Sequence, residues 1–96
     1  MEARHFIVRG RVQGVGFRFV AEREARRAGV HGWVRNRADG AVETLAIGER
    51  GALENFRRRL EQGPPAARVA GVETEPAELS PEEMRAYRGF GIADTE

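Results

Sequence analysis

The spacing of apolar residues switches back and forth between the period of a strand and that of a helix, and this order limits the folds open to the chain. Apolar and polar side chains largely alternate over His5–Val12, which predicts a strand. Phe17–Ala28 carries apolar residues at helical spacing among charged ones, and Gly29 follows where a helix C-cap is expected. The chain therefore begins with a strand and an amphipathic helix.

The middle of the chain repeats this alternation and adds a hairpin. Val30–Asn36 and Ala41–Gly48 read as strands, and they flank Asp39-Gly40, a pair typical of tight hairpin turns. Apolar residues at helical spacing between Leu53 and Leu60 predict a second amphipathic helix, which Gly63-Pro64-Pro65 ends. These patterns predict two paired strands followed by a helix.

The C-terminal third adds further strands. Arg68–Glu75 predicts a fourth strand and Gly89–Ala93 a short fifth one, while Ser80-Pro81-Glu82-Glu83 has the N-cap and first-turn proline of a short helix. The order β-α-β-β-α-β plus a terminal strand is typical of the α+β, ferredoxin-like split βαβ sandwich. In that fold two helices cover one face of an antiparallel sheet. We expect residues 1–96 to form one such domain.

The composition excludes several kinds of chemistry. The 96 residues include no cysteine, which excludes disulfides, thiolate catalysis and cysteine-bound zinc, and no lysine, which excludes Schiff-base catalysis. Sixteen basic residues against 15 acidic ones give a net charge of +1, which does not favour general nucleic-acid binding. With no membrane-length apolar run and no signal-peptide pattern, we expect a soluble, cytoplasmic, monomeric protein.

The loop between the first strand and the first helix has the composition of an anion-binding loop. Gly14 and Gly16 permit backbone conformations that turn N–H groups toward one point, and Arg18 adds a planar donor fork at the helix start. The residues predicted to bind phosphate are Gln13, Gly14, Val15, Gly16, Phe17 and Arg18. We expect this loop to hold inorganic phosphate or sulfate as well as a phosphorylated substrate.

A second part of the predicted site is Asn36, at the end of the second strand. A crossover helix makes the first two strands parallel, so their C-terminal ends lie at the same edge of the sheet. If the returning strand of the hairpin lies between them, the two backbones are about 10 Å apart, which leaves room for a phosphoryl group and a water. Arg18 and Asn36 are therefore the candidate catalytic pair.

Two runs of sequence, Gly10–Arg18 and Gly32–Asn36, together resemble the acylphosphatase family, whose members hydrolyse the carboxyl–phosphate bond of acyl phosphates. The resemblance continues to the terminal Phe90-Gly91-Ile92. It implies that the substrate is a small acyl phosphate, that Arg18 binds its phosphate and that Asn36 positions the attacking water.

The chemistry of acyl-phosphate hydrolysis fits these residues. The conjugate acid of the leaving carboxylate has a pKa of about 4, so no general acid is required. The transition state spreads negative charge over phosphoryl oxygens, which Arg18 and the loop amides could stabilise. The amide of Asn36 can donate to a water and accept from it, and a phosphoryl oxygen of the substrate then takes the proton. Because two histidines without a spaced carboxylate cluster offer no metal site, we expect no metal and no cofactor.

Other interpretations of the same residues are weaker. A nucleotide P-loop needs lysine followed by serine or threonine, and a dinucleotide fold needs a third glycine where Phe19 stands. A regulatory domain that only binds a small anion has no use for a water-orienting amide at Asn36. Arg57-Arg58-Arg59 is more typical of a solvated helix face than of an anion or RNA patch.

The strongest competing function is RNA binding, because RNA-recognition modules share the β-α-β-β-α-β layout. Arg88-Gly89-Phe90-Gly91 matches the opening of their signature, but the later aromatics are missing and the match falls on the last strand. The signature belongs on the returning strand of the hairpin, Ala41–Gly48, which contains no aromatic residue. We therefore expect neither nucleic-acid nor membrane binding.

Overall fold

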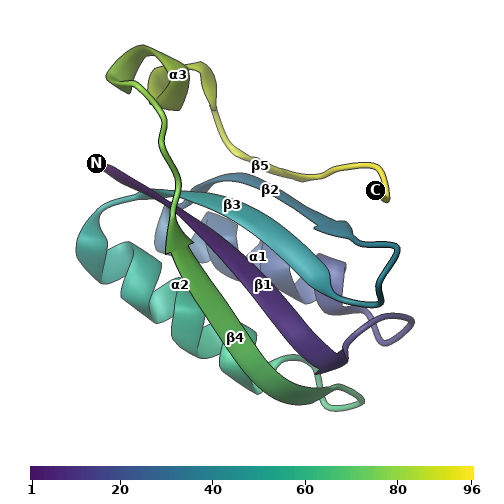
Figure 1. Cartoon of the computed structure of the whole chain (residues 1–96). Helices are drawn as coiled ribbons and strands as arrows, with labels where there is room; N and C mark the ends of the chain where they lie inside the picture. Colours follow the sequence, from purple (N-terminus) through teal and green to yellow (C-terminus); the bar gives the residue numbers. More distant parts are fainter.

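The computed structural model describes all 96 residues, which form a five-stranded sheet with helices packed against it (Figure 1). The elements in chain order are β1 (Glu2–Arg11), α1 (Phe17–Ala28), β2 (His31–Asn36), β3 (Val42–Gly48), α2 (Arg50–Gln62), β4 (Arg68–Pro76), α3 (Pro81–Ala86) and β5 (Phe90–Ile92). The strands lie in the order β4-β1-β3-β2-β5. The predicted α+β, ferredoxin-like fold class is confirmed.

The strand that returns from the hairpin, β3, lies between β1 and β2 and pairs antiparallel with both. Val42 of β3 is in register with Val8 of β1 on one side and with Asn36 of β2 on the other. The C-terminal ends of β1 and β2 therefore meet at one edge of the sheet, as the sequence predicts. β5 pairs parallel with β2, so the added strand makes the sheet mixed.

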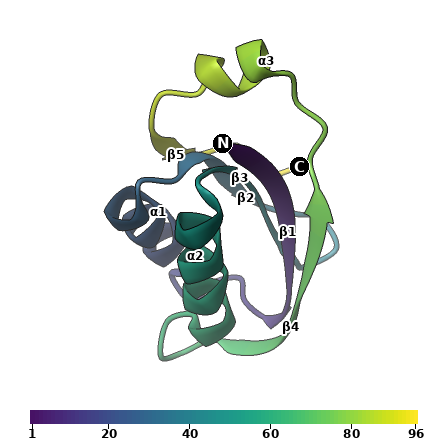
Figure 2. The same ribbon diagram turned by 90° about the vertical axis from the view of Figure 1, so that its left-hand side faces the viewer.

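The core lies between the sheet and the two long helices, which cover the same face of the sheet (Figure 2). Phe56 of α2 meets Phe6 of β1 and Phe90 of β5 edge to face, with ring centroids 6.1 and 5.7 Å apart. Phe17, the first residue of α1, is also fully buried in this core. The start of α1 is thus held firmly against the sheet.

One local sequence feature acts as predicted, the start of the short helix at Ser80, and a second, Gly32, has a role that the sequence analysis did not predict. The side chain of Ser80 accepts a hydrogen bond from the backbone N–H of Glu83, and the Glu83 carboxylate accepts one from the N–H of Ser80, which caps the short helix α3. Gly32 allows the close approach of β2 to β3, because a Cβ there would lie 2.0 Å from the carbonyl oxygen of Leu45.

No helix in the structure is both long enough and apolar enough to cross a membrane. The cytoplasmic location and the monomeric state stay predictions.

Candidate active site

The loop between β1 and α1 depends on two glycines in the left-handed region of backbone space. Gly14 has φ 73° and Gly16 has φ 81°. A Cβ added at either position would meet no atom within 4 Å, so glycine serves here for its backbone conformation and not for lack of space. The chain turns sharply at both residues and enters α1 directly at Phe17.

This helix start is left without internal hydrogen-bond partners. Gly16 is the N-cap and has no side chain to cap the helix, and the first turn contains no acidic residue. The first hydrogen bond of the helix runs from the N–H of Val20 to the carbonyl of Gly16, and no N–H of residues 14–19 donates to a protein acceptor. Such free amides, together with the positive end of the helix dipole, favour an anion.

The side chains of Arg18 and Asn36 border the same cavity as this loop. The cavity has a volume of about 250 Å³ and is lined by Val12, Gly14, Gly16, Phe17, Arg18, Phe19, Asn36 and Ile92. Arg18 is half-buried and forms no ion pair or hydrogen bond, and the carboxamide of Asn36 is half-buried and makes none either. The structure therefore brings the two predicted catalytic residues together and leaves both polar groups free.

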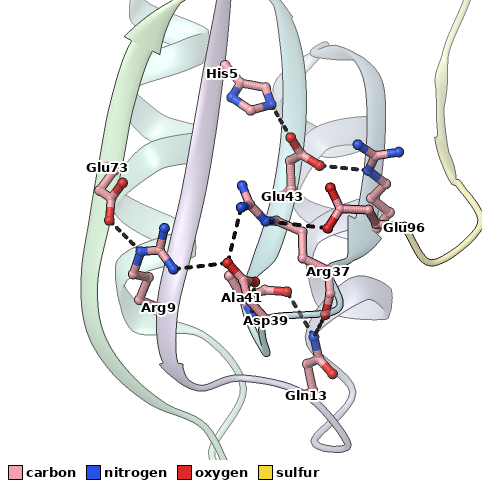
Figure 3. Close-up of polar contacts among 10 residues, drawn as sticks. His5, Arg9, Gln13, Arg37, Asp39, Ala41, Glu43, Glu73 and Glu96 are labelled. Atoms are coloured by element: carbon pink, nitrogen blue, oxygen red, sulfur yellow. Dashed lines mark hydrogen bonds and ion pairs between the residues drawn. The ribbon is translucent and has the colours of Figure 1, made fainter.

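Gln13 has a role that sequence reasoning missed. Its side-chain N–H group donates to the carbonyl of Arg37 at 2.8 Å and to that of Ala41 at 2.9 Å (Figure 3). Both acceptors lie at the β2–β3 hairpin, so Gln13 ties the loop to the turn that follows Asn36. Gln13 and Val15 do not line the cavity, and only their backbone N–H groups are available to an anion.

The hairpin itself is fixed by ion pairs on the face of the sheet away from α1 and α2. Asp39 lies 3.1 Å from Arg37 and 3.4 Å from Arg9, and Arg9 also pairs with Glu73 of β4 (Figure 3). The N–H of Ala41 donates to Asp39 and, with the two arginines, holds the pKa of Asp39 below its usual value. These contacts stiffen the turn beside the site without entering the cavity.

A second cluster on that face surrounds Glu43, which is almost fully buried. His5 Nε2 and Arg35 Nε each lie 2.6 Å from the Glu43 carboxylate, and Arg35 stacks 5.0 Å above the ring of Trp33. Burial opposes ionisation of Glu43, but the hydrogen bond from Arg35 and the charges of His5 and Arg35 outweigh it, so its pKa is lowered. Both oxygens of the Glu43 carboxylate are thus paired with side chains of the neighbouring strands β1 and β2.

No group of three or more histidine, aspartate or glutamate side chains is placed to hold a metal ion. Free amides, a free guanidinium and a free carboxamide thus border one cavity of a ferredoxin-like domain. Hydrogen-bond donors gathered in this way, with no carboxylate among them, define the class of protein: a small domain with a cavity suited to an anion.

Comparison with known proteins identifies the family within that class. The family model described as Acylphosphatase matches residues 4–92. A relative named acylphosphatase from Nitrobacter hamburgensis is 52% identical over 81 residues, which is 84% of this chain and 82% of that protein. The crystal structure of acylphosphatase from Bacillus subtilis superposes with a TM-score of 0.88 at 36% identity and covers 97% of this chain and 99% of its own.

The same architecture also occurs inside a larger protein. Full-length HypF, solved in a phosphate- and nucleotide-bound form, matches 98% of this chain but only 12% of its own length, with a TM-score of 0.83 at 26% identity. Taken with the family match, these likenesses show that the chain belongs to the acylphosphatase family, whose members are hydrolases.

Proposed function

We propose that this member of the acylphosphatase family hydrolyses small acyl phosphates to a carboxylate and inorganic phosphate. In this proposal Arg18 and the loop amides bind the phosphoryl group, and Asn36 orients the water. The observation that carries this proposal is the shared cavity. It collects the free N–H groups of the loop, the unpaired guanidinium of Arg18 and the unpaired carboxamide of Asn36 in one place.

The binding step needs donors that are fixed before the substrate arrives. The two left-handed glycines fix the direction of the loop amides, and buried Phe17 anchors the start of the helix. Arg18, which follows Phe17 directly, can then offer two parallel N–H groups to two phosphoryl oxygens. Because no protein carboxylate pairs with Arg18, binding phosphate breaks no existing ion pair.

The chemical step needs a positioned water and little else. The carboxylate leaves without protonation, because its conjugate acid has a pKa of only about 4. The carboxamide of Asn36 accepts one hydrogen bond from the water and can donate another, which fixes the water beside phosphorus. The water oxygen bonds to phosphorus as one of its protons passes to a phosphoryl oxygen. The P–O bond to the acyl group breaks, and the products are carboxylate and inorganic phosphate. As negative charge spreads over the oxygens, Arg18 and the amides bind them more tightly.

RNA binding, the alternative suggested by the layout, has less support. The aromatic residue of the matching run, Phe90, is only 4% exposed, and its ring packs against Phe56 in the core. A base could not stack on it without opening the core. We propose that the protein binds no nucleic acid.

The proposal is tested by following phosphate release from acetyl phosphate in the presence of a chelator, with a phosphate monoester as the comparison substrate. We expect hydrolysis of the acyl phosphate, competitive inhibition by inorganic phosphate or sulfate, and little activity on the monoester, whose poor leaving group lacks a general acid. Activity that disappears in chelator and returns with a divalent cation would contradict the mechanism.

A further inference from the structure

Two of the three large apolar side chains that are exposed lie at one place. The three are Met1, Phe19 and Ile92, which are 63%, 68% and 45% exposed. Phe19 and Ile92 both line the active-site cavity. Met1 precedes β1 and so lies away from the cavity, because the loop between β1 and α1 follows the other end of that strand. Apolar surface is therefore exposed where the site opens to solvent. Contact of this surface with water is unfavourable, and exposed apolar patches often mark binding sites.

The packing of α1 against β5 brings these two side chains to the same rim. Arg26 of α1 donates to the carbonyl of Phe90 at 3.2 Å, which fixes one point of contact between the two elements. Phe19 lies two helical turns before Arg26 on the same helix face. Ile92 lies two residues beyond Phe90, toward the same end of the molecule, because β5 runs parallel to β2 and β2 ends at Asn36.

The position of β5 is itself fixed by hydrogen bonds. The N–H of Gly89 donates to His31 Nδ1 at 2.7 Å, the N–H of Gly32 donates to the carbonyl of Gly89 at 3.0 Å, and the N–H of Ala93 donates to the carbonyl of Val34 at 2.8 Å. Hydrogen bonds at Gly89 and Ala93 therefore fix β5 before and after Ile92. Ile92 is exposed because this strand is held in place with the side chain facing solvent.

We propose that Phe19 and Ile92 form a subsite for the acyl group and make the enzyme selective for acyl phosphates with an apolar chain. This inference rests on the proposed function, because it assumes that the phosphoryl group sits in the loop. The acyl group must then extend toward the mouth of the cavity, where these two side chains lie.

The chemistry of the rim favours an apolar chain over a charged one. Apart from Arg18, which the phosphoryl group occupies, the cavity is lined by glycines, apolar residues and the neutral Asn36. A hydrocarbon chain that covers Phe19 and Ile92 removes apolar surface from water on both partners. A short or charged acyl group gains nothing there. For a chain of several methylene groups the expected gain in kcat/KM is about tenfold.

The test compares acetyl phosphate with hexanoyl phosphate. The two leaving groups are carboxylates of simple aliphatic acids and have nearly the same basicity. The ratio of kcat/KM for the two substrates therefore reports contacts to the acyl chain. We expect hexanoyl phosphate to be preferred by about tenfold, through a lower KM, and the Phe19→Ala/Ile92→Ala double variant to lose most of that preference. Met84→Ala, which shortens an apolar side chain of α3 that does not line the cavity, should keep it.

Two outcomes would overturn the subsite. If the protein hydrolyses both substrates but the ratio is the same in wild type, double variant and Met84→Ala, the rim does not select the acyl group, and the proposed function stands alone. If neither substrate is hydrolysed, the proposed function fails and the subsite fails with it. Circular dichroism of the double variant, in which only exposed side chains change, should match that of wild type.

Discussion

Two groups of polar side chains in this protein differ in whether they have partners within the protein. On the face of the sheet away from the long helices, Arg9, Arg35 and Arg37 all pair with carboxylates. In the cavity at the end of β1 and β2, Arg18 and Asn36 have no partner in the protein. Both regions border the hairpin between β2 and β3 and both contain arginine, but only the sheet face supplies carboxylates to pair with it.

Under the proposed mechanism, this difference separates polar groups that stabilise the fold from those that act on the substrate. A buried polar group normally has a hydrogen-bond partner, because leaving it unpaired costs folding free energy. Pairs such as Arg35–Glu43 therefore stabilise the register of neighbouring strands. The polar groups of Arg18 and Asn36 still reach solvent, and the one buried side-chain polar atom without a hydrogen-bond partner is Arg37 Nε, on the paired face. An anion that binds in the cavity therefore replaces water on groups already in place, which is the behaviour expected of a preorganised site.

The largest expected effect comes from removing the free guanidinium. Arg18→Ala should lower kcat/KM for acetyl phosphate by about 10³ or more and abolish phosphate binding, because an arginine has effects of this size in phosphoryl transfer. Arg18→Lys should recover little of this, because a point charge lacks the planar fork. Steady-state kinetics measure both.

The matched control for Arg18 is Arg9, an arginine whose partners are Glu73 and Asp39. Arg9→Ala should keep kcat/KM within about threefold of wild type, because exposed ion pairs contribute little. Equal losses in the two variants would break the distinction between free and paired arginines.

Asn36→Ala should lower kcat by about 10²–10³, by analogy with the loss of one transition-state donor, while the inhibition constant of phosphate changes little. This split is expected because the proposed mechanism has Asn36 contacting the water and not the bound phosphate. Asn55→Ala, on the exposed surface of α2, serves as the control. A large loss of phosphate affinity in Asn36→Ala would assign the residue to binding instead.

On the paired side, Glu43→Gln should lower the free energy of unfolding by about 2 kcal/mol, because Arg35 and His5 lose a buried charged partner. Its effect on kcat should be small. Urea unfolding at pH 7 measures the first and steady-state kinetics the second. A stable Glu43→Gln with much reduced kcat would show that this cluster serves catalysis.

The difference in free energy of unfolding between wild type and Glu43→Gln should depend on pH, because the pKa of Glu43 is lowered in the folded protein. A carboxyl whose pKa is lower in the folded state stabilises the fold fully above its ordinary value of 4.5. That contribution disappears as the pH falls through the lower, folded pKa. The stability gap between wild type and Glu43→Gln should therefore be constant near neutral pH and shrink below 4.5. A gap that widens in acid would contradict the assignment.

The smallest expected effect is at Gln13, which links the two regions. Gln13→Ala removes two hydrogen bonds to the hairpin and should lower the free energy of unfolding by about 1 kcal/mol. Because the loop is then less firmly held, kcat/KM should fall by about fivefold. Gln13→Glu, which cannot donate to the carbonyls, should be at least as impaired. Unchanged kinetics in both variants would show that the hairpin does not position the loop.

The free groups of the site were predictable from the sequence because their signals are local. Gly14 and Gly16 predict left-handed backbone, and Arg18 follows at a helix start. The strand order that puts Asn36 beside them follows from rules of crossover connections and hairpins. The strand order and the residues of the turns were therefore sufficient to predict that Arg18 and Asn36 lie near the same loop.

The partners of the paired groups were not predictable in the same way. The bond from Gln13 to Arg37 depends on where a turn 24 residues away presents its carbonyl oxygen. The Arg35–Glu43 pair depends on the exact register of β2 and β3. The rim formed by Phe19 and Ile92 depends on which strand β5 joins, and no local pattern in Gly89–Ala93 specifies β2.

The most direct test of the free-group site is a titration of the ¹⁵N-labelled protein with inorganic phosphate, followed by amide chemical shifts. We expect one saturable site at which the amides of residues 14–19 shift most, and we expect these shifts to be lost in Arg18→Ala and kept in Arg9→Ala. Shifts centred on the paired arginines of the sheet face, or shifts that persist in Arg18→Ala, would contradict the assignment of the cavity as the phosphate site.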